Sequence, residues 1–181
     1  MNDSRPAPDD FSRAPELDVF AWLDKHGLTH ETITHIPTHT VAESREVKTS
    51  IAGGHTKNLF MKDKKGRVAL VSAWAESDLP LNQLHKHIGV QRLSFTKADL
   101  LWDHLKVTPG SVSAFALIHD EPGHVRFVVD KALMAFDVVN FHPLRNDMTT
   151  SVSREDFCKF VESTGRDLEV VDFTALTGST D

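Results

Sequence analysis

Four apolar residues follow one another at Val68-Ala69-Leu70-Val71, and this run restricts the possible folds more than any other part of the sequence. A strand with one face in water alternates apolar and polar residues, whereas an unbroken apolar strand is covered on both faces. A second strand-like stretch, 57–61, precedes the run and is separated from it by the turn-forming sequence Asp63-Lys64-Lys65-Gly66. We therefore expect a hairpin whose second strand lies inside a sheet flanked by helices.

Helix and strand patterns alternate irregularly along the rest of the chain. Helices are expected from Pro15, after Ser153, and over 40–51, 81–87 and 96–105. Further strands are expected over 30–36, 114–118, 125–129, 138–141, 148–152 and 168–173. Hairpin patterns outnumber strand–helix–strand patterns, which predicts one α/β domain around a curved mixed central sheet rather than a doubly wound fold. We expect this domain to span 14–175, with tails at 1–13 and 176–181.

The charge balance limits the class of partner. The 181 residues include 20 Lys and Arg against 26 Asp and Glu, a net charge of −6, which argues against a protein that coats DNA or RNA without selectivity. Within 55–67, however, five basic residues stand against Asp63, a local charge of +4: Lys57, Lys62, Lys64, Lys65 and Arg67. Such an edge predicts brief, salt-sensitive contact with a nucleic acid end, although lysines also discourage edge-to-edge strand pairing.

The longest apolar stretch, 68–75, is far shorter than a membrane span, and the polar N-terminus does not resemble a secretory signal. These features predict a cytoplasmic protein without a membrane partner. Cys158 is the only cysteine, so an internal disulfide and a zinc site with two or more cysteines are excluded. Its position between Phe157 and Phe160 favours a buried thiol over a nucleophile, and no G-x-S-x-G motif is present.

The 11 histidines suggest a metal site, but their local spacing does not support one. The segment from His30 to His35 resembles an HExxH motif with one residue too many, and on a strand its two histidines point to opposite faces. The pair His85 and His87 likewise lies on different sides of a short helix. We therefore expect no metal and no cofactor, and treat most of these rings as surface or hydrogen-bonded core residues.

Three segments carry the most specific pattern. The first, 55–60, reads His-Thr-Lys-Asn-Leu-Phe directly after Gly53-Gly54; the second, 107–113, reads Val-Thr-Pro-Gly-Ser-Val-Ser; the third, 140–144, reads Asn-Phe-His-Pro-Leu. In this order they closely resemble the YbaK/prolyl-tRNA-synthetase-associated editing-domain family, and within it the freestanding prolyl-tRNA editing branch. The resemblance extends from about residue 15 to 173. It implies a mixed α/β domain and a cleft for the aminoacyl end of tRNA.

The resemblance also implies which residues act. Lys57 matches the functional lysine of the family, Asn58 its adjacent asparagine and His142 its histidine, while Gly110 and Ser111 match its glycine-containing substrate loop. Lys57, His142 and Gly110 are thus the expected catalytic residues, and the expected substrate-binding residues are Asn58, Ser111, Thr56, Phe60 and Val112. An aminoacyl ester is already activated, so its hydrolysis needs a positioned water and a stabilised oxyanion rather than a covalent nucleophile.

The implied activity is trans-editing, the hydrolysis of a mischarged tRNA ester, with Ala-tRNA(Pro) as the expected substrate and the tRNA acceptor end as partner. A proline pocket cannot strongly exclude the smaller alanine, which makes a second sieve useful. Prolyl-tRNA synthetase is a further expected partner, whereas DNA is not. Ala114 and Ala116 replace the Pro and Gly common in relatives, which leaves a Cys- or Ser-directed deacylase open. A non-catalytic tRNA- or synthetase-binding module and a metal hydrolase are the alternatives of other classes.

Overall fold

The computed structural model describes residues 5–176, and the outer parts of both predicted tails, 1–4 and 177–181, lie outside this range. The helices are α1 (Glu16–Lys25), α2 (Val41–Ser50), α3 (Leu81–His87), α4 (Ala98–Leu105), α5 (Arg154–Ser163) and α6 (Phe173–Leu176), with 3-10 helices η1 (Ala114–His119) and η2 (Leu133–Ala135). The strands are β1 (His30–Thr34), β2 (Gly54–Lys62), β3 (Val68–Trp74), β4 (Ser94–Phe95), β5 (Val125–Asp130), β6 (Val138–Phe141), β7 (Met148–Ser153) and β8 (Glu169–Val171).

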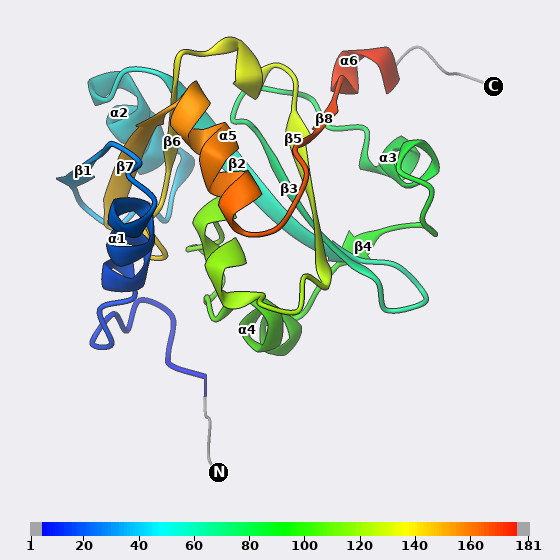
Figure 1. The fold of residues 1–181 in the computed structure, drawn as a ribbon, viewed down its shortest axis with the longest axis horizontal. Coiled ribbons are helices and arrows are strands. Elements are labelled where there is room, and N and C mark those ends of the chain that lie inside the picture. Colours follow the sequence, from blue (N-terminus) through cyan, green and yellow to red (C-terminus); the bar gives the residue numbers. More distant parts are fainter. Residues whose placement is uncertain (1–4, 177–181) are drawn as a thin grey trace.

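The eight strands form one mixed sheet in the order β1-β7-β6-β2-β3-β5-β8, and β4 pairs with the end of β2 (Figure 1). The predicted hairpin is present, because β2 and β3 pair antiparallel with Phe60 opposite Leu70. The predicted pair β6 and β7 is antiparallel as well. Parallel pairing joins β2 to β6, β3 to β5 and β5 to β8, which confirms the mixed α/β domain.

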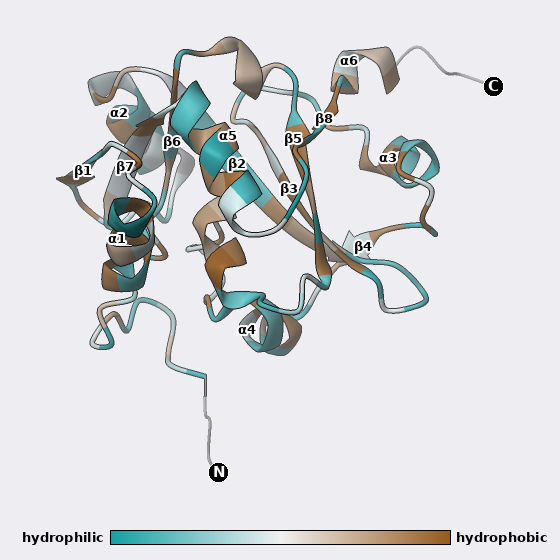
Figure 2. Ribbon diagram, viewed as in Figure 1, coloured by the Kyte–Doolittle hydropathy of each residue, from teal (hydrophilic) through white to brown (hydrophobic). Residues whose placement is uncertain are grey.

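Strand β3 lies between two hydrophobic clusters, as its unbroken apolar run predicts. Leu70 and Val71 are both 0% exposed, and they belong to different clusters because neighbouring side chains point to opposite faces. The larger cluster, here called the first-face cluster, joins the sheet to α1, α4, η1 and α5. The second-face cluster joins it to α3 and α6. Figure 2 shows apolar stretches along the central strands and hydrophilic residues on α3 and α5.

The strand expected over 114–118 is wrong, whereas the one expected over 125–129 is present as β5. Residues 114–119 form the 3-10 helix η1, which begins where the Ser113 hydroxyl accepts a hydrogen bond from the backbone N–H of Phe115 at 3.2 Å. Five consecutive residues of η1, 114–118, are buried. A short apolar run covered on all sides has no periodicity that separates a strand from a helix, which explains the error.

The segment before α1 packs on the domain within the described residues. The guanidinium of Arg145 lies 4.7 Å from the centroid of the Phe11 ring, and that of Arg13 lies 5.8 Å from the Trp102 ring. No helix in residues 5–176 is both long and apolar enough to cross a membrane.

Packing around Phe115 gives a prediction about stability. Its side chain is 0% exposed, and its ring centroid lies 5.4 Å from that of Phe141 and 5.2 Å from that of Phe160. The substitution Phe115→Ala leaves a cavity between the sheet and α5 and is expected to lower the free energy of unfolding by about 3 to 5 kcal/mol. Urea denaturation measures this change. Phe95→Ala, at a ring that is 63% exposed, is the control and should change it by less than about 0.5 kcal/mol.

Candidate functional site

A cleft between α2 and the sheet contains two of the predicted site residues. It encloses about 340 Å³ of space, part of it open to solvent. Its walls come from α2 and from the segments around β2, β6 and β7, and they consist of Thr38, Ser44, Val47, Lys48, His55, Thr56, Asn140, Phe141, His142 and Thr149. Thr56 and His142, 86 residues apart in the numbering, therefore meet in this α2 cleft.

The floor of the α2 cleft is the short parallel contact between β2 and β6. Only Gly54 with Val139 and His55 with Asn140 pair there. A Cβ added at Gly53, which has φ +106°, would lie 2.7 Å from the Val138 carbonyl oxygen, so a glycine is needed for the approach. Asn140, which is 2% exposed, stabilises this contact between β2 and β6 with two hydrogen bonds. Its Nδ2 donates to the Ala52 oxygen at 3.0 Å, and its backbone oxygen accepts from Thr56 Oγ1 at 2.8 Å.

His142 presents a free acceptor nitrogen to this cleft. Its Nδ1 lies 2.6 Å from the backbone oxygen of Met148, and since a carbonyl only accepts, Nδ1 carries the proton. Burial lowers the pKa of His142 below its ordinary value, and the neighbouring rings of His35 and His55 lower it further. The ring is consequently neutral near pH 7, and its Nε2 is left to accept a hydrogen bond.

His55, which also lines the cleft, repeats this arrangement. Its Nε2 donates to the Ile51 oxygen at 2.8 Å, which leaves Nδ1 as the acceptor. Burial is the main cause that lowers the pKa of His55, with Lys48 and His35 as further causes. The α2 cleft thus holds two neutral imidazoles, each fixed in one tautomer by a backbone carbonyl.

His35 lies next to His142 but does not line the cleft. Its ring centroid lies 6.1 Å from that of His142. Its Nδ1 donates to the Ile36 oxygen at 2.7 Å, and its Nε2 accepts from the Thr149 hydroxyl at 2.8 Å. Both ring nitrogens are therefore occupied, and His35 holds Thr149 in place rather than offering an atom to a ligand.

Lys57 lies on the other side of β2 from most of its predicted partners. Alternation puts it on the face of Leu59 and Met61, both packed in the second-face cluster. Its Nζ donates to the backbone oxygen of Ser77, which lines a second, wider cleft beside Trp74. Lys57 adjoins Thr56 in sequence but does not line the α2 cleft.

The remaining predicted residues of β2 face the first-face cluster. Asn58 Nδ2 donates to Thr56 Oγ1 at 3.2 Å, and Asn58 Oδ1 accepts from the Ser72 hydroxyl at 2.5 Å. Phe60 is 5% exposed and part of the core, with its ring 6.0 Å from that of His104. Phe60 therefore serves packing in this structure.

The predicted substrate loop forms a turn of its own. Gly110 is exposed with φ +91°, and the backbone N–H of Ser111 donates to the Thr108 oxygen at 3.1 Å. Ser111 is 1% exposed, and its Oγ has no hydrogen-bond partner within residues 5–176. Val112 packs against the first-face cluster. The structure places Gly110, Ser111 and Val112 outside the lining of the α2 cleft.

Most residues of the cleft wall were not predicted from the sequence. His55 had a usable signal, because it stands in the motif 55–60 directly before Thr56. Ser44, Val47 and Lys48 had none, since a polar helix does not reveal which sheet edge it covers.

Comparison with known proteins decides the family. The model of the aminoacyl-tRNA editing domain matches residues 35–160. The chain belongs to this family. It is 35% identical over 155 residues to the prolyl-tRNA editing protein ProX of Acetoanaerobium sticklandii, covering 85% of this chain and 94% of that protein. It is 36% identical over 148 residues to the bovine prolyl-tRNA synthetase associated domain-containing protein 1, covering 79% and 86%.

Solved structures share the fold. The crystal structure of the hypothetical protein APE2540 has a TM-score of 0.68 at 25% identity, covering 85% of this chain and 97% of that one. A second, described as a candidate trans-editing enzyme for prolyl-tRNA synthetase, also has a TM-score of 0.68, at 16% identity and 87% and 95% coverage. The predicted family is therefore confirmed. The protein is an aminoacyl-tRNA editing enzyme, a hydrolase that acts on mischarged tRNA.

The lowered pKa of His142 predicts a pH-dependent stability. Between this lowered pKa and the ordinary value of 6.5, the unfolded chain binds a proton that the folded chain does not. Stability from this source is complete above about pH 7 and is lost progressively as the pH falls below 6.5 toward the lowered pKa. His142→Asn keeps a donor for the Met148 oxygen but does not titrate, so its free energy of unfolding should fall less over this range.

Urea denaturation at pH 7, 6 and 5 measures the difference. The control is His26→Asn, because His26 is exposed and makes the same Nδ1 bond to a backbone oxygen, that of Trp22 at 2.8 Å. An unchanged pH slope in His142→Asn would show that the His142 ring does not titrate differently in the folded chain.

Proposed function

We propose that this protein is a trans-editing deacylase for Ala-tRNA(Pro), which hydrolyses the ester between alanine and the terminal ribose. The observation that carries the proposal is the 35% identity to the prolyl-tRNA editing protein ProX over 94% of that relative. The α2 cleft provides a site of suitable chemistry, with polar atoms that converge from three segments of the chain.

The two neutral imidazoles suit the aminoacyl group. An α-ammonium or a water molecule offers protons, and the two histidines that line the cleft offer His142 Nε2 and His55 Nδ1 as acceptors. A protonated imidazole would repel the ammonium, so the lowered pKa values of His142 and His55 favour binding near pH 7. In this proposal the pair orients the amino group or the attacking water, and no covalent intermediate forms.

The α2 cleft has a small apolar wall made of Val47 and Phe141. In this proposal the wall contacts the methyl group of alanine, and discrimination against the larger ring of proline provides the second sieve that the synthetase itself lacks.

Lys57 is proposed to hold the terminal phosphate or ribose. Its ammonium rests on the Ser77 carbonyl, and a lysine on a flexible stem can exchange a carbonyl for a phosphate oxygen. Asn58 keeps its proposed substrate-binding role and Gly110 its proposed oxyanion role, whereas Ser111 is buried and its N–H donates to the Thr108 oxygen, so it is given no direct contact with the ester. For these contacts to form, the acceptor end of the tRNA must extend past the α2 cleft along β2.

Ala114 and Ala116 do not favour the Cys- or Ser-directed alternative. Both are 0% exposed inside η1, and neither lines the α2 cleft. Their departure from the family pattern therefore alters the core rather than the cleft wall. Prolyl-tRNA synthetase as a partner and the cytoplasm as the location are retained as proposals.

A deacylation panel tests the activity. Ala-tRNA(Pro), Cys-tRNA(Pro), Ser-tRNA and Pro-tRNA(Pro) are incubated with the purified protein, and the loss of the aminoacyl ester is followed. We expect Ala-tRNA(Pro) to be hydrolysed fastest and Pro-tRNA(Pro) to remain intact, with no change on addition of EDTA. Equal rates on the alanyl and prolyl esters would exclude the sieve, and no acceleration on any substrate would favour a binding module.

Lys57→Ala tests the proposed phosphate contact. Losing one charge-assisted hydrogen bond in the transition state is expected to lower kcat/KM for Ala-tRNA(Pro) by about 10- to 100-fold. Lys86→Ala is the matched control, because Lys86 is an exposed lysine of α3 that lies outside the basic edge and should change kcat/KM less than about twofold. Equal effects of the two substitutions would remove Lys57 from the site.

A further inference from the structure

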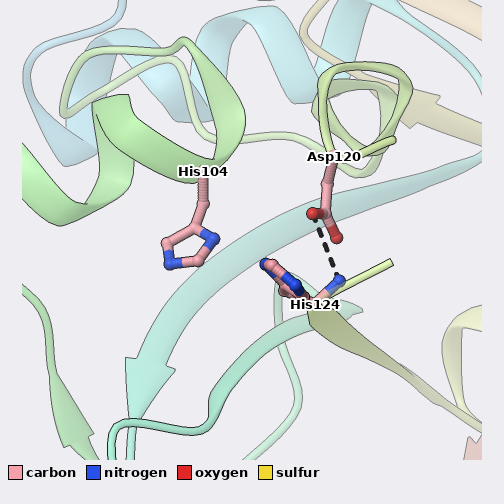
Figure 3. Close-up of side chains that lie close together, drawn as sticks. All are labelled: His104, Asp120 and His124. Atoms are coloured by element: carbon pink, nitrogen blue, oxygen red, sulfur yellow. Dashed lines mark hydrogen bonds between the residues drawn. The ribbon is translucent and has the colours of Figure 1, made fainter. Parts of the chain in front are cut away.

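A group of potential metal ligands lies outside the α2 cleft. His104 at the end of α4, Asp120 after η1 and His124 before β5 each offer a ligand atom, and these atoms all lie within 4.8 Å of one another. Figure 3 shows the two imidazoles side by side, with the Asp120 carboxylate above the His124 ring. The two ring centroids are 6.2 Å apart. Within the described residues this is the one such group.

Two imidazoles and a carboxylate are a ligand set of borderline softness. They suit Zn²⁺ and its neighbours in the transition series, whereas Mg²⁺ and Ca²⁺ prefer sites made of oxygen atoms. Ligand atoms around a tetrahedral zinc ion lie about 3.4 Å apart, so the side chains must close by roughly an ångström. His124 is exposed and His104 is half-buried, which leaves both rings free to rotate toward the ion.

Asp120 is the fixed member of the group. Its side chain is 2% exposed, and its Oδ2 accepts from Arg166 Nη2 and from the backbone N–H of Val125 at 2.7 Å. Its Oδ1 accepts only a long bond, from the backbone N–H of His124 at 3.2 Å. A carboxylate oxygen has two lone pairs, so Oδ1 keeps one for a metal. Arg166 neutralises the carboxylate and thereby limits the affinity for a cation.

We propose that His104, Asp120 and His124 bind one divalent transition-metal ion, with Zn²⁺ as the best fit and solvent in the fourth position. The three residues come from two separate segments, α4 and the turn between η1 and β5. The ion would fasten α4 to this turn. None of the three residues lines the α2 cleft, so the site is structural and separate from ester hydrolysis.

Zinc titration of the full chain without a histidine tag tests the proposal. The protein is stripped with EDTA, dialysed and titrated with ZnCl2 by calorimetry, and its Tm is measured with and without the ion. We expect one equivalent to bind, with a rise in Tm of about 5 to 10 °C at a free concentration near 100 times Kd. Absence of a stoichiometric binding event would overturn the proposal.

Single substitutions locate the ion. His104→Gln and His124→Gln each remove one ligand and are expected to weaken zinc binding at least tenfold and to abolish the Tm rise, with the metal-free Tm nearly unchanged. The control is His87→Gln, because His87 is an exposed histidine of α3 and should leave the titration unaffected. Binding that persists in both ligand variants, or that is lost equally in His87→Gln, would show scattered surface coordination instead.

Discussion

The parallel contact between β2 and β6 is the interaction on which the rest of the site depends. It consists of two residue pairs, yet it joins the antiparallel strands β1, β7 and β6 to the strands β3, β5 and β8. Gly53 permits the close approach, and the buried amide of Asn140 holds it through Ala52 and Ser151. Because so few bonds join the halves, a buried amide with every partner satisfied specifies the register strongly.

The same contact explains the electrostatics of the cleft. His55 pairs with Asn140, and the chain leaves β6 directly at His142, so both rings meet where the strands meet. Burial there lowers the pKa of each ring. The backbone carbonyl of Ile51 fixes the tautomer of His55, and that of Met148 fixes the tautomer of His142. An acidic protein thus keeps two uncharged acceptors in this cleft, mainly through burial and to a smaller extent through the neighbouring Lys48 and histidine rings.

Much of the fold could be predicted from sequence because its strongest signals are local. The run 68–71 specified a strand covered on both faces, and Ser153 marked the start of α5, where its hydroxyl accepts from Asp156. The prediction for the run 114–118 failed because burial on all sides removes the periodicity that separates a strand from a helix.

The site was harder to predict than the fold. A motif identifies residues by type, but the pleat of β2 sends Lys57 and Asn58 to opposite faces of the sheet. Long-range meetings such as His104 with His124 leave no mark in local spacing.

Helix α2 contributes three side chains to the cleft, and among its described side chains none belongs to either hydrophobic cluster. Its start is fixed by the reciprocal hydrogen bonds of Thr40 and Glu43. Its cleft-facing positions, Ser44, Val47 and Lys48, donate and accept no sheet hydrogen bonds. Substitutions at these three positions can therefore reshape the wall of the α2 cleft while the sheet and its histidines stay in place. If the aminoacyl group binds there as proposed, selectivity for a new one can evolve on one short helix without a new scaffold.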